Sequence, residues 1–154
     1  MKRPFLKLLH FTYFRILGIF KPISIGVRVL LIQDDKVLMV KHSYQDEWFL
    51  VGGGAKRHET LAQAARREAM EEAGATLGEM ELFGIYTKNT YLHTDHIALF
   101  LCKDFTYTGT GDWEIDEIEF FPLNVLPEDT APGIRRSIDD YIEGVKPKEG
   151  FGEW

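Results

Sequence analysis

Residues Gly53–Ala75 read GGAKRHETLAQAARREAMEEAGA, and this stretch decides the fold. If residues 60–73 form a helix, Glu68, Glu71 and Glu72 fall at positions i, i+3 and i+4 and project from one face. Three carboxylates crowded on one face repel each other unless a cation lies between them. Because such hard oxygen ligands suit Mg²⁺ or Mn²⁺, the stretch predicts a helix that presents a divalent-metal site.

The same stretch resembles the signature of the Nudix hydrolases. That signature reads Gly, five residues, Glu, seven residues, and then Arg-Glu-U-x-Glu-Glu-x-Gly-U, where U is a bulky aliphatic residue. Every fixed polar and glycine position matches, at Gly53, Glu59, Arg67, Glu68, Glu71, Glu72 and Gly74. The two U positions depart from it, being Ala69 and Ala75. We expect these small residues to fit a helix that packs closely on a sheet.

The resemblance covers residues 23–143 and implies an α/β fold, an α/β/α sandwich with a mixed β-sheet. Thr60 and Gln63 have the spacing of a capping box, and Gly74 stands where a helix end favours positive φ. The pattern predicts strands over residues 24–33, 37–41, 80–88, 96–103 and 115–121, and helices over 60–73 and 131–142. A stripe of small residues should pack the first helix on the sheet: Ala62, Ala65, Ala69 and Ala73.

Composition narrows the function classes. A chain of 154 residues with 45% hydrophobic content suits one domain with a real core. The net charge of −6 argues against binding of a nucleic acid polymer. The single cysteine, Cys102, lies in an apolar run, so we expect a buried, inert thiol in a reducing, cytoplasmic compartment.

The two ends of the chain lie outside the resemblance. Residues 1–22 are basic, and residues 5–20 are mostly apolar with a narrow polar stripe, which predicts an extra N-terminal helix. Charges interrupt this stretch, whereas a membrane span needs roughly 20 apolar residues. Three uses stay open: docking on its own domain, a homodimer contact, or peripheral binding to an anionic membrane surface. Residues 144–154 are polar and glycine-containing, and we expect a flexible tail.

The resemblance also implies a reaction. Nudix enzymes hydrolyse a nucleoside diphosphate linked to another group, by attack of water on phosphorus. Glu68, Glu71 and Glu72 would hold Mg²⁺, with Mn²⁺ as a substitute, helped by the backbone carbonyl of Gly53. One of Glu71 and Glu72 would contact the nucleophilic water.

The remaining signature residues would support that site. Arg67 and Glu59 would orient the carboxylates. The general base stays open between Glu71 and an acid of the later segment, either Glu117 or Glu114.

Substrate contacts are harder to read. Lys56 and Arg57 stand where the family often has an acid and a proline, so they either contact substrate phosphates or form a solvated turn. Tyr91 either stacks a base or is an ordinary strand residue. ADP-ribose, nucleotide sugars, dinucleoside polyphosphates and nucleoside triphosphates all stay open as substrates.

Two other functions compete with this one. The domain is either an enzyme of this kind or a nucleotide-binding sensor, and its complete set of carboxylates favours catalysis. A membrane-recruited hydrolase of lipid-linked diphosphates rests only on the basic, apolar residues 5–20.

Overall fold

The computed structural model describes residues 23–147 and 150–154. The predicted N-terminal helix over residues 5–20 therefore lies outside the described residues. Within the described ranges, no helix is both long and apolar enough to cross a membrane.

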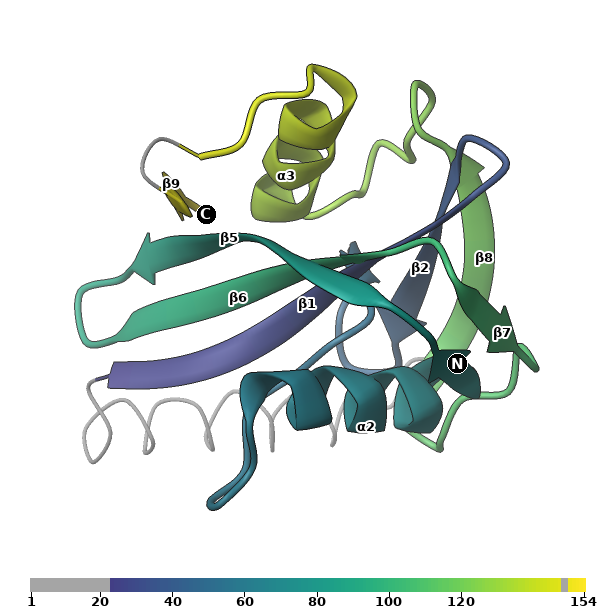
Figure 1. Cartoon of the computed structure of the whole chain (residues 1–154), viewed down its shortest axis with the longest axis horizontal. Coiled ribbons are helices and arrows are strands. Elements are labelled where there is room, and N and C mark those ends of the chain that lie inside the picture. The colour runs from purple at the N-terminus through teal and green to yellow at the C-terminus, as the bar shows by residue number, and fades with distance from the viewer. Residues whose placement is uncertain (1–22, 148–149) are drawn as a thin grey trace.

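A seven-stranded mixed sheet forms the centre of the domain (Figure 1). Its strands are β1 (Ile23–Gln33), β2 (Lys36–His42), β3 (Trp48–Leu50), β5 (Met80–Asn89), β6 (Thr94–Cys102), β8 (Ile115–Pro122) and β9 (Phe151–Glu153). They follow the order β3-β2-β1-β6-β5-β9, and β8 pairs with the other side of β2. The long central pair, β1 with β6, is parallel, whereas β5 pairs with β6 and β8 with β2 in antiparallel register.

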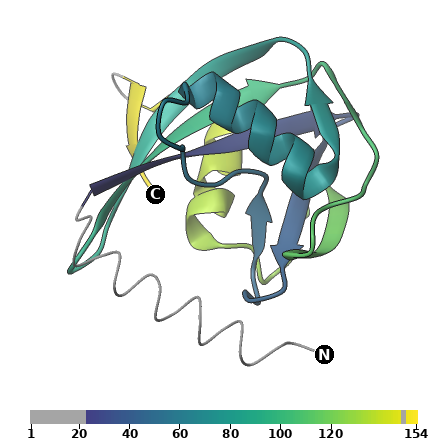
Figure 2. The same cartoon turned by 90° about the horizontal axis from the view of Figure 1, so that it is seen from below.

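Two helices cover opposite faces of this sheet (Figure 1). They are α2 (Leu61–Ala73) and α3 (Pro132–Ile142). Figure 2, seen from below, shows α2 in front of the strands and α3 behind them. Side chains of β1 point alternately to the two faces of the sheet and so contribute to both cores. Val27 and Val29 pack with the alanines of α2, whereas Leu30 packs with Ile134 and Ile138 of α3. The predicted α/β/α sandwich is confirmed.

Local signals set the ends of α2. The Thr60 side chain accepts from the backbone of Gln63, whose own side chain accepts from the Thr60 N–H at 2.9 Å, completing the capping box. Gly74 ends the helix at φ +60°, and its N–H donates to Met70 O. The predicted start and stop of this helix are therefore both present.

The alanine stripe of α2 differs from the prediction at one of its four members. The fully buried alanines are Ala64, Ala65, Ala69 and Ala73. Ala62 is exposed, so its assignment to the buried stripe was wrong. Ala69 and Ala75, which replace bulky aliphatic residues, are 0% and 1% exposed, so their small side chains are enclosed by the core.

A small second sheet was missed from the sequence. It pairs β4 (Ala75–Leu77) with β7 (Phe105–Tyr107) in antiparallel register, beside the C-terminal end of α2. Each strand has only three residues, which is too short for alternation to stand out from a loop. Cys102, the last residue of β6, is buried, and burial raises the pKa of its thiol, in keeping with the predicted inert role.

The C-terminal tail corrects one expectation. Within residues 144–154, which we expected to be flexible, β9 pairs in parallel with β5 (Figure 1). The Trp154 N–H donates to Thr87 O at 2.9 Å, and the Trp154 ring lies edge-on to Tyr86 at 5.5 Å between centroids. Gly152 makes this approach possible, because a Cβ there would lie 2.8 Å from the Tyr86 ring. Trp154 thus holds residues 151–154 against β5, although the polar composition of the tail suggested disorder.

Candidate functional site

A glycine loop between β3 and α2 forms the floor of the site. At Gly52 the backbone has φ +144°, and a Cβ there would lie 2.1 Å from Val27 O, so only glycine fits. The Val27 N–H donates to Gly53 O at 2.9 Å. From β1, Arg28 Nη1 donates to the carbonyls of both Leu50 and Gly52 at 2.7 Å. These contacts hold the loop against the central strand.

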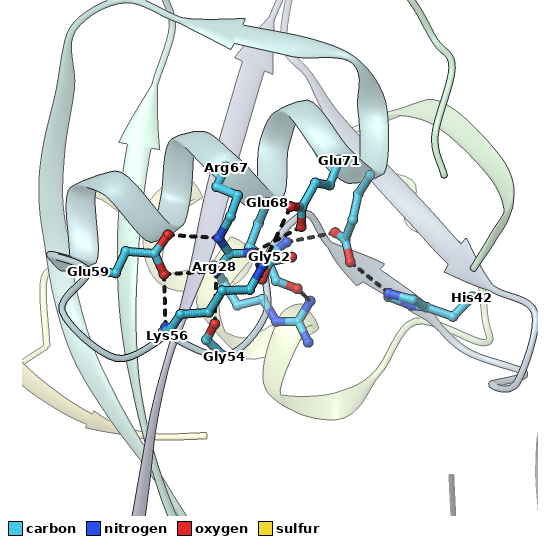
Figure 3. A network of polar contacts seen from close by, with 10 residues as sticks. Arg28, His42, Gly52, Gly54, Lys56, Glu59, Arg67, Glu68 and Glu71 are labelled. Atoms are coloured by element: carbon cyan, nitrogen blue, oxygen red, sulfur yellow. Dashed lines mark hydrogen bonds and ion pairs between the residues drawn. The ribbon is translucent and has the colours of Figure 1, made fainter. Parts of the chain in front are cut away.

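Arg67 is the hub of the polar network in Figure 3. Its Nε and Nη2 donate to the two oxygens of Glu59 at 2.7 and 2.9 Å. Nη1 donates to Glu68 at 2.6 Å and to Glu71 at 3.0 Å, and Nη2 also donates to Gly54 O at 3.1 Å. These contacts match the number of N–H donors on a guanidinium. The bond to Arg67 is the main reason that the pKa of Glu59 falls to about 2.

Glu68 lies directly behind the glycine loop. A Cβ at Gly53 would lie only 2.7 Å from Glu68 Oε1, so the missing side chain leaves room for this carboxylate. Burial raises the pKa of Glu68, Arg67 lowers it, and the nearby charges of Glu72 and Glu71 raise it. The three carboxylates are therefore close enough to repel one another, as their helical spacing predicted.

Glu72 is held by a different set of donors. It is 7% exposed, its Oε2 accepts from the Gly52 N–H at 2.8 Å, and its Oε1 lies 2.8 Å from His42 Nε2. Sequence reasoning missed His42, which is the last residue of β2. The sequence offers one signal for it: residues two apart on a strand share a face, so His42 lies on the same face as the buried Val40.

The donor chemistry of this site fits Mg²⁺ or Mn²⁺. Glu68, Glu71, Glu72 and the Gly53 carbonyl offer only oxygen, and Glu71 is 43% exposed, which leaves it open to an incoming ion. In the described ranges, no three acidic, histidine or cysteine side chains are already gathered around one point as a metal site. The Arg67 guanidinium lies between Glu68 and Glu71, with Nη1 at 2.6 and 3.0 Å from their carboxylate oxygens.

The loop before β8 brings a further acid to the site. The Asp112 N–H donates to Glu71 O, and the Ser43 N–H donates to Glu114 O, both at 2.8 Å. Burial raises the pKa of Glu114, and the charges of Asp112, Glu72 and Glu71 raise it further, opposed by His42. Glu114 is thus an electrostatic neighbour of the signature carboxylates.

Glu117, the other predicted general base, lies elsewhere. It is exposed and pairs in register with Lys41 of β2. The Lys41 ammonium binds Asp129 at 2.6 Å and lies 5.4 Å from the ring of Trp48, which packs with α3. Because neighbouring strand residues point to opposite faces, Lys41 and Glu117 face away from His42 and α2. The structure does not bring Glu117 to the carboxylates.

The predicted substrate-binding residues separate in the same way. Lys56 is exposed, and its Nζ lies 3.7 Å from Glu71 Oε1, which places it beside the carboxylates (Figure 3). Arg57 follows it and is exposed. Tyr91 is fully exposed in the turn between β5 and β6, at the left end of the sheet in Figure 1, whereas the carboxylate-bearing half of α2 lies toward the right. The structure does not bring Tyr91 to the site.

Known proteins resemble this chain in sequence and in fold. The family model described as NUDIX domain matches residues 22–141. Diphosphoinositol polyphosphate phosphohydrolase 2 of Rattus norvegicus is 34% identical over 83 residues, which cover 53% of this chain and 44% of that protein. The ADP-ribose pyrophosphatase of Methanocaldococcus jannaschii is 29% identical over 125 residues, which cover 77% of this chain and 73% of that protein. The chain thus spans less than half the length of the first of these relatives.

Solved structures show the same fold. The MutT NUDIX hydrolase from Burkholderia pseudomallei aligns with a TM-score of 0.70 at 19% identity, over 76% of this chain and 96% of the other. A NUDIX hydrolase from Nitrosomonas europaea also aligns with a TM-score of 0.70, at 23% identity, over 80% of this chain and 90% of the other.

Proposed function

The chain belongs to the Nudix family, and on this premise we propose that it is a metal-dependent pyrophosphohydrolase. It cleaves the diphosphate linkage of a nucleoside diphosphate joined to another group. The observation that carries the proposal is the meeting of Glu68, Glu71 and Glu72 beside the glycine loop, with Arg67 bridging two of them. A module that only bound nucleotides would not need three carboxylates close enough to repel one another.

The residues divide the work of the site. Glu68, Glu71, Glu72 and the carbonyl of Gly53 hold one or more Mg²⁺ ions, and Mn²⁺ can take their place. When bound, the metal neutralises charge on the diphosphate and acidifies water. Arg67, through its contacts with Glu68 and Glu71, fixes the carboxylates in the geometry that receives the ion.

Water supplies the nucleophile. It loses a proton to a nearby carboxylate and attacks phosphorus, the bridging P–O bond breaks, and the leaving phosphate takes the electron pair. Glu114 and Glu71 are the candidate bases. We favour Glu114, because burial and neighbouring charges raise the pKa of its carboxyl, and a base accepts a proton best when its pKa is closer to neutral.

The charge around the site favours a nucleoside diphosphate derivative over an inositol polyphosphate. Arg28 and Arg67 already bind carbonyls and carboxylates of the protein itself. Lys56 makes only a long, exposed ion pair with Glu71 at 3.7 Å, and Arg57 is exposed, so both are accessible to substrate phosphates. Two flexible basic side chains suit one diphosphate bridge, and a ring carrying many phosphates calls for a larger basic surface. Asp112 and Glu114, in the loop that contacts the end of α2, would repel such a ring.

Trp113 offers a surface for the nucleoside. It is 67% exposed and lies between Asp112, whose backbone binds α2, and Glu114, which borders the carboxylates. An exposed indole beside a phosphate site can stack a base, and such stacking contributes about 1–3 kcal/mol per base. We therefore place the base over Trp113 and the diphosphate over the carboxylates.

The proposal is tested by phosphate release from a substrate panel, coupled to a phosphatase or pyrophosphatase, with Mg²⁺ or Mn²⁺. The panel contains ADP-ribose, nucleotide sugars, dinucleoside polyphosphates, nucleoside triphosphates and a diphosphoinositol polyphosphate. We expect metal-dependent turnover of a nucleoside diphosphate derivative, lost in Glu71→Gln and kept in Glu119→Gln, an exposed acid on β8. Turnover that survives Glu71→Gln would refute the assigned site.

Two further variants resolve the roles. Glu114→Gln should lower kcat more than Glu117→Gln does, and the reverse order would move the base to Glu117. Trp113→Ala should raise KM about tenfold or more for the nucleoside substrate, the equivalent of the stacking energy. The same variant should hydrolyse a diphosphate substrate that lacks a nucleobase at the wild-type rate. Preferred turnover of the diphosphoinositol polyphosphate would overturn the substrate assignment while leaving the hydrolase intact.

A further inference from the structure

His42 is a buried histidine with one polar contact. It is 5% exposed, and its Nε2 lies 2.8 Å from Glu72 Oε1. Its other ring nitrogen, Nδ1, is buried and has no hydrogen-bond partner among the described residues. An ionised carboxylate only accepts hydrogen bonds, so the contact requires the proton on Nε2. Whatever polar role the ring has is therefore exerted through Nε2 on Glu72.

The three signature carboxylates are held by two separate devices. Arg67 binds Glu68 and Glu71, at 2.6 and 3.0 Å. Glu72 is instead bound by His42 and by the Gly52 N–H. Without these two donors, repulsion from the other carboxylates would favour rotation of Glu72 away from them. The contacts from β2 and from the glycine loop oppose that rotation.

We propose that His42 is a positioning residue, which holds Glu72 in the orientation that receives the metal. This inference rests on the proposed function. Each carboxylate oxygen has two acceptor positions, and in this structure each Glu72 oxygen accepts one hydrogen bond. One position per oxygen stays available to a cation, so His42 orients the ligand without displacing the ion. Ligating carboxylates commonly carry such supporting hydrogen bonds.

The imidazole is itself fixed in place. The ring of Tyr44 lies 5.1 Å from it at an interplanar angle of 34°, and the ring of Phe49 lies 5.9 Å away, edge-on at 72°. His42 also ends β2, where backbone pairing to β8 holds the main chain. A donor locked by packing and by the sheet holds its partner more accurately than one on a mobile loop.

The test separates the hydrogen bond from the packing of the ring. His42→Gln places an amide donor near the position of Nε2, His42→Phe keeps a ring without a donor, and His42→Asn keeps an amide too short to reach Glu72. The readouts are Mn²⁺ affinity by electron paramagnetic resonance, without substrate, and kcat with the best substrate of the panel. Lys41→Gln is the control, because this neighbour faces the other side of the sheet and binds Asp129.

We expect His42→Phe and His42→Asn to lose about 10–100-fold in Mn²⁺ affinity and in kcat. The Mn²⁺ affinity and kcat of His42→Gln should stay within about threefold of the wild-type values, because its amide keeps the hydrogen bond to Glu72. In a Glu72→Gln background, His42→Phe should lower Mn²⁺ affinity and kcat little further, because the carboxylate that His42 binds is already replaced. Wild-type Mn²⁺ affinity in both His42→Phe and His42→Asn would overturn the proposal, as would a loss in His42→Gln equal to theirs.

If one variant fails to fold, which near-ultraviolet circular dichroism would reveal, the other two still decide the question. The outcome for the proposed function is separate. A wild-type protein that neither binds Mn²⁺ nor hydrolyses any substrate would refute the hydrolase assignment. A wild-type protein that does both, with unaffected His42 variants, would refute the positioning role alone.

Discussion

Glu59 accepts two parallel hydrogen bonds from Arg67, one from Nε at 2.7 Å and one from Nη2 at 2.9 Å. This bidentate pair links the loop before α2 to the middle of the helix. Bidentate arginine–carboxylate pairs fix geometry as well as charge, because both groups are planar and must lie in one plane. Every bond that Arg67 makes to the other glutamates depends on this orientation.

Acid should release this pair in a defined pH window. The pKa of Glu59 falls from 4.5 to about 2, chiefly through Arg67. A lowered carboxyl pKa means that the stabilising contribution is fully present above pH 4.5 and is lost as pH falls from 4.5 toward 2. Urea unfolding of wild type and Glu59→Gln should therefore give a difference in unfolding free energy that shrinks across this window. A difference that stayed constant with pH would contradict the assignment.

Arg67→Lys should damage catalysis more than folding. Lysine keeps the charge but lacks the planar fork that binds Glu59, Glu68 and Glu71 at once. We expect kcat to fall about 10–100-fold, with the thermal midpoint changing by a few degrees. Arg66→Lys is the matched control, since the adjacent Arg66 turns to the carbonyls of Leu77 and Gly78. Equal losses in kcat for both variants would argue against a special role for Arg67.

Gly52→Ala should destabilise the protein by about 3 kcal/mol, from backbone strain and a clash. The positive φ of +144° disfavours any side chain, and the added Cβ would overlap Val27 O. Gly54→Ala should cost much less, because a Cβ at that position meets no atom within 4 Å. Equilibrium urea denaturation of both variants measures the difference. Similar costs at the two glycines would mean that the loop can move away from β1.

Ala69→Leu tests the small residue in place of the bulky aliphatic of the signature. Because Ala69 is fully buried between α2 and the sheet, we expect overpacking to cost about 1–3 kcal/mol. Ala62→Leu, on the exposed face of the same helix, should change stability by about 0.5 kcal/mol or less. The two unfolding free energies are directly comparable. A stabilised Ala69→Leu protein would show that this interface has unused space.

The sequence predicts the helix of the site better than its surroundings, because the helix is specified locally. Spacing places Glu68, Glu71 and Glu72 together, and Thr60 and Gly74 mark the helix ends within a few residues. The carboxylate spacing and the two helix caps each involve residues that are close together in the sequence. These local signals do not depend on how distant segments of the chain fold.

Contacts between distant segments were not readable in the same way. His42 and Arg28 contact the site through the lateral order of strands, which spacing along one strand does not specify. The choice between Glu114 and Glu117 depends on which face each residue takes near an irregular register at Lys41. A shift of one residue exchanges the two faces of a strand, so sequence left both acids open. The tail was predicted to be flexible for a related reason. Trp154 stabilises it through contact with Tyr86, a residue far away in the sequence.

The parallel pairing of β1 with β6 also bears on how fast the domain assembles. Ile23 pairs with Thr94, 71 positions later in the chain, whereas Asn89 and Thr94 of the β5–β6 hairpin are near neighbours. Closing the longer loop costs entropy before its contacts stabilise anything, so that pairing should be the slow event in folding. The glycine loop is anchored on β1 through Val27. A folding intermediate with the β5–β6 hairpin formed but β1 unpaired would therefore be partly structured. It would be inactive, because the glycine loop would have no strand to anchor it.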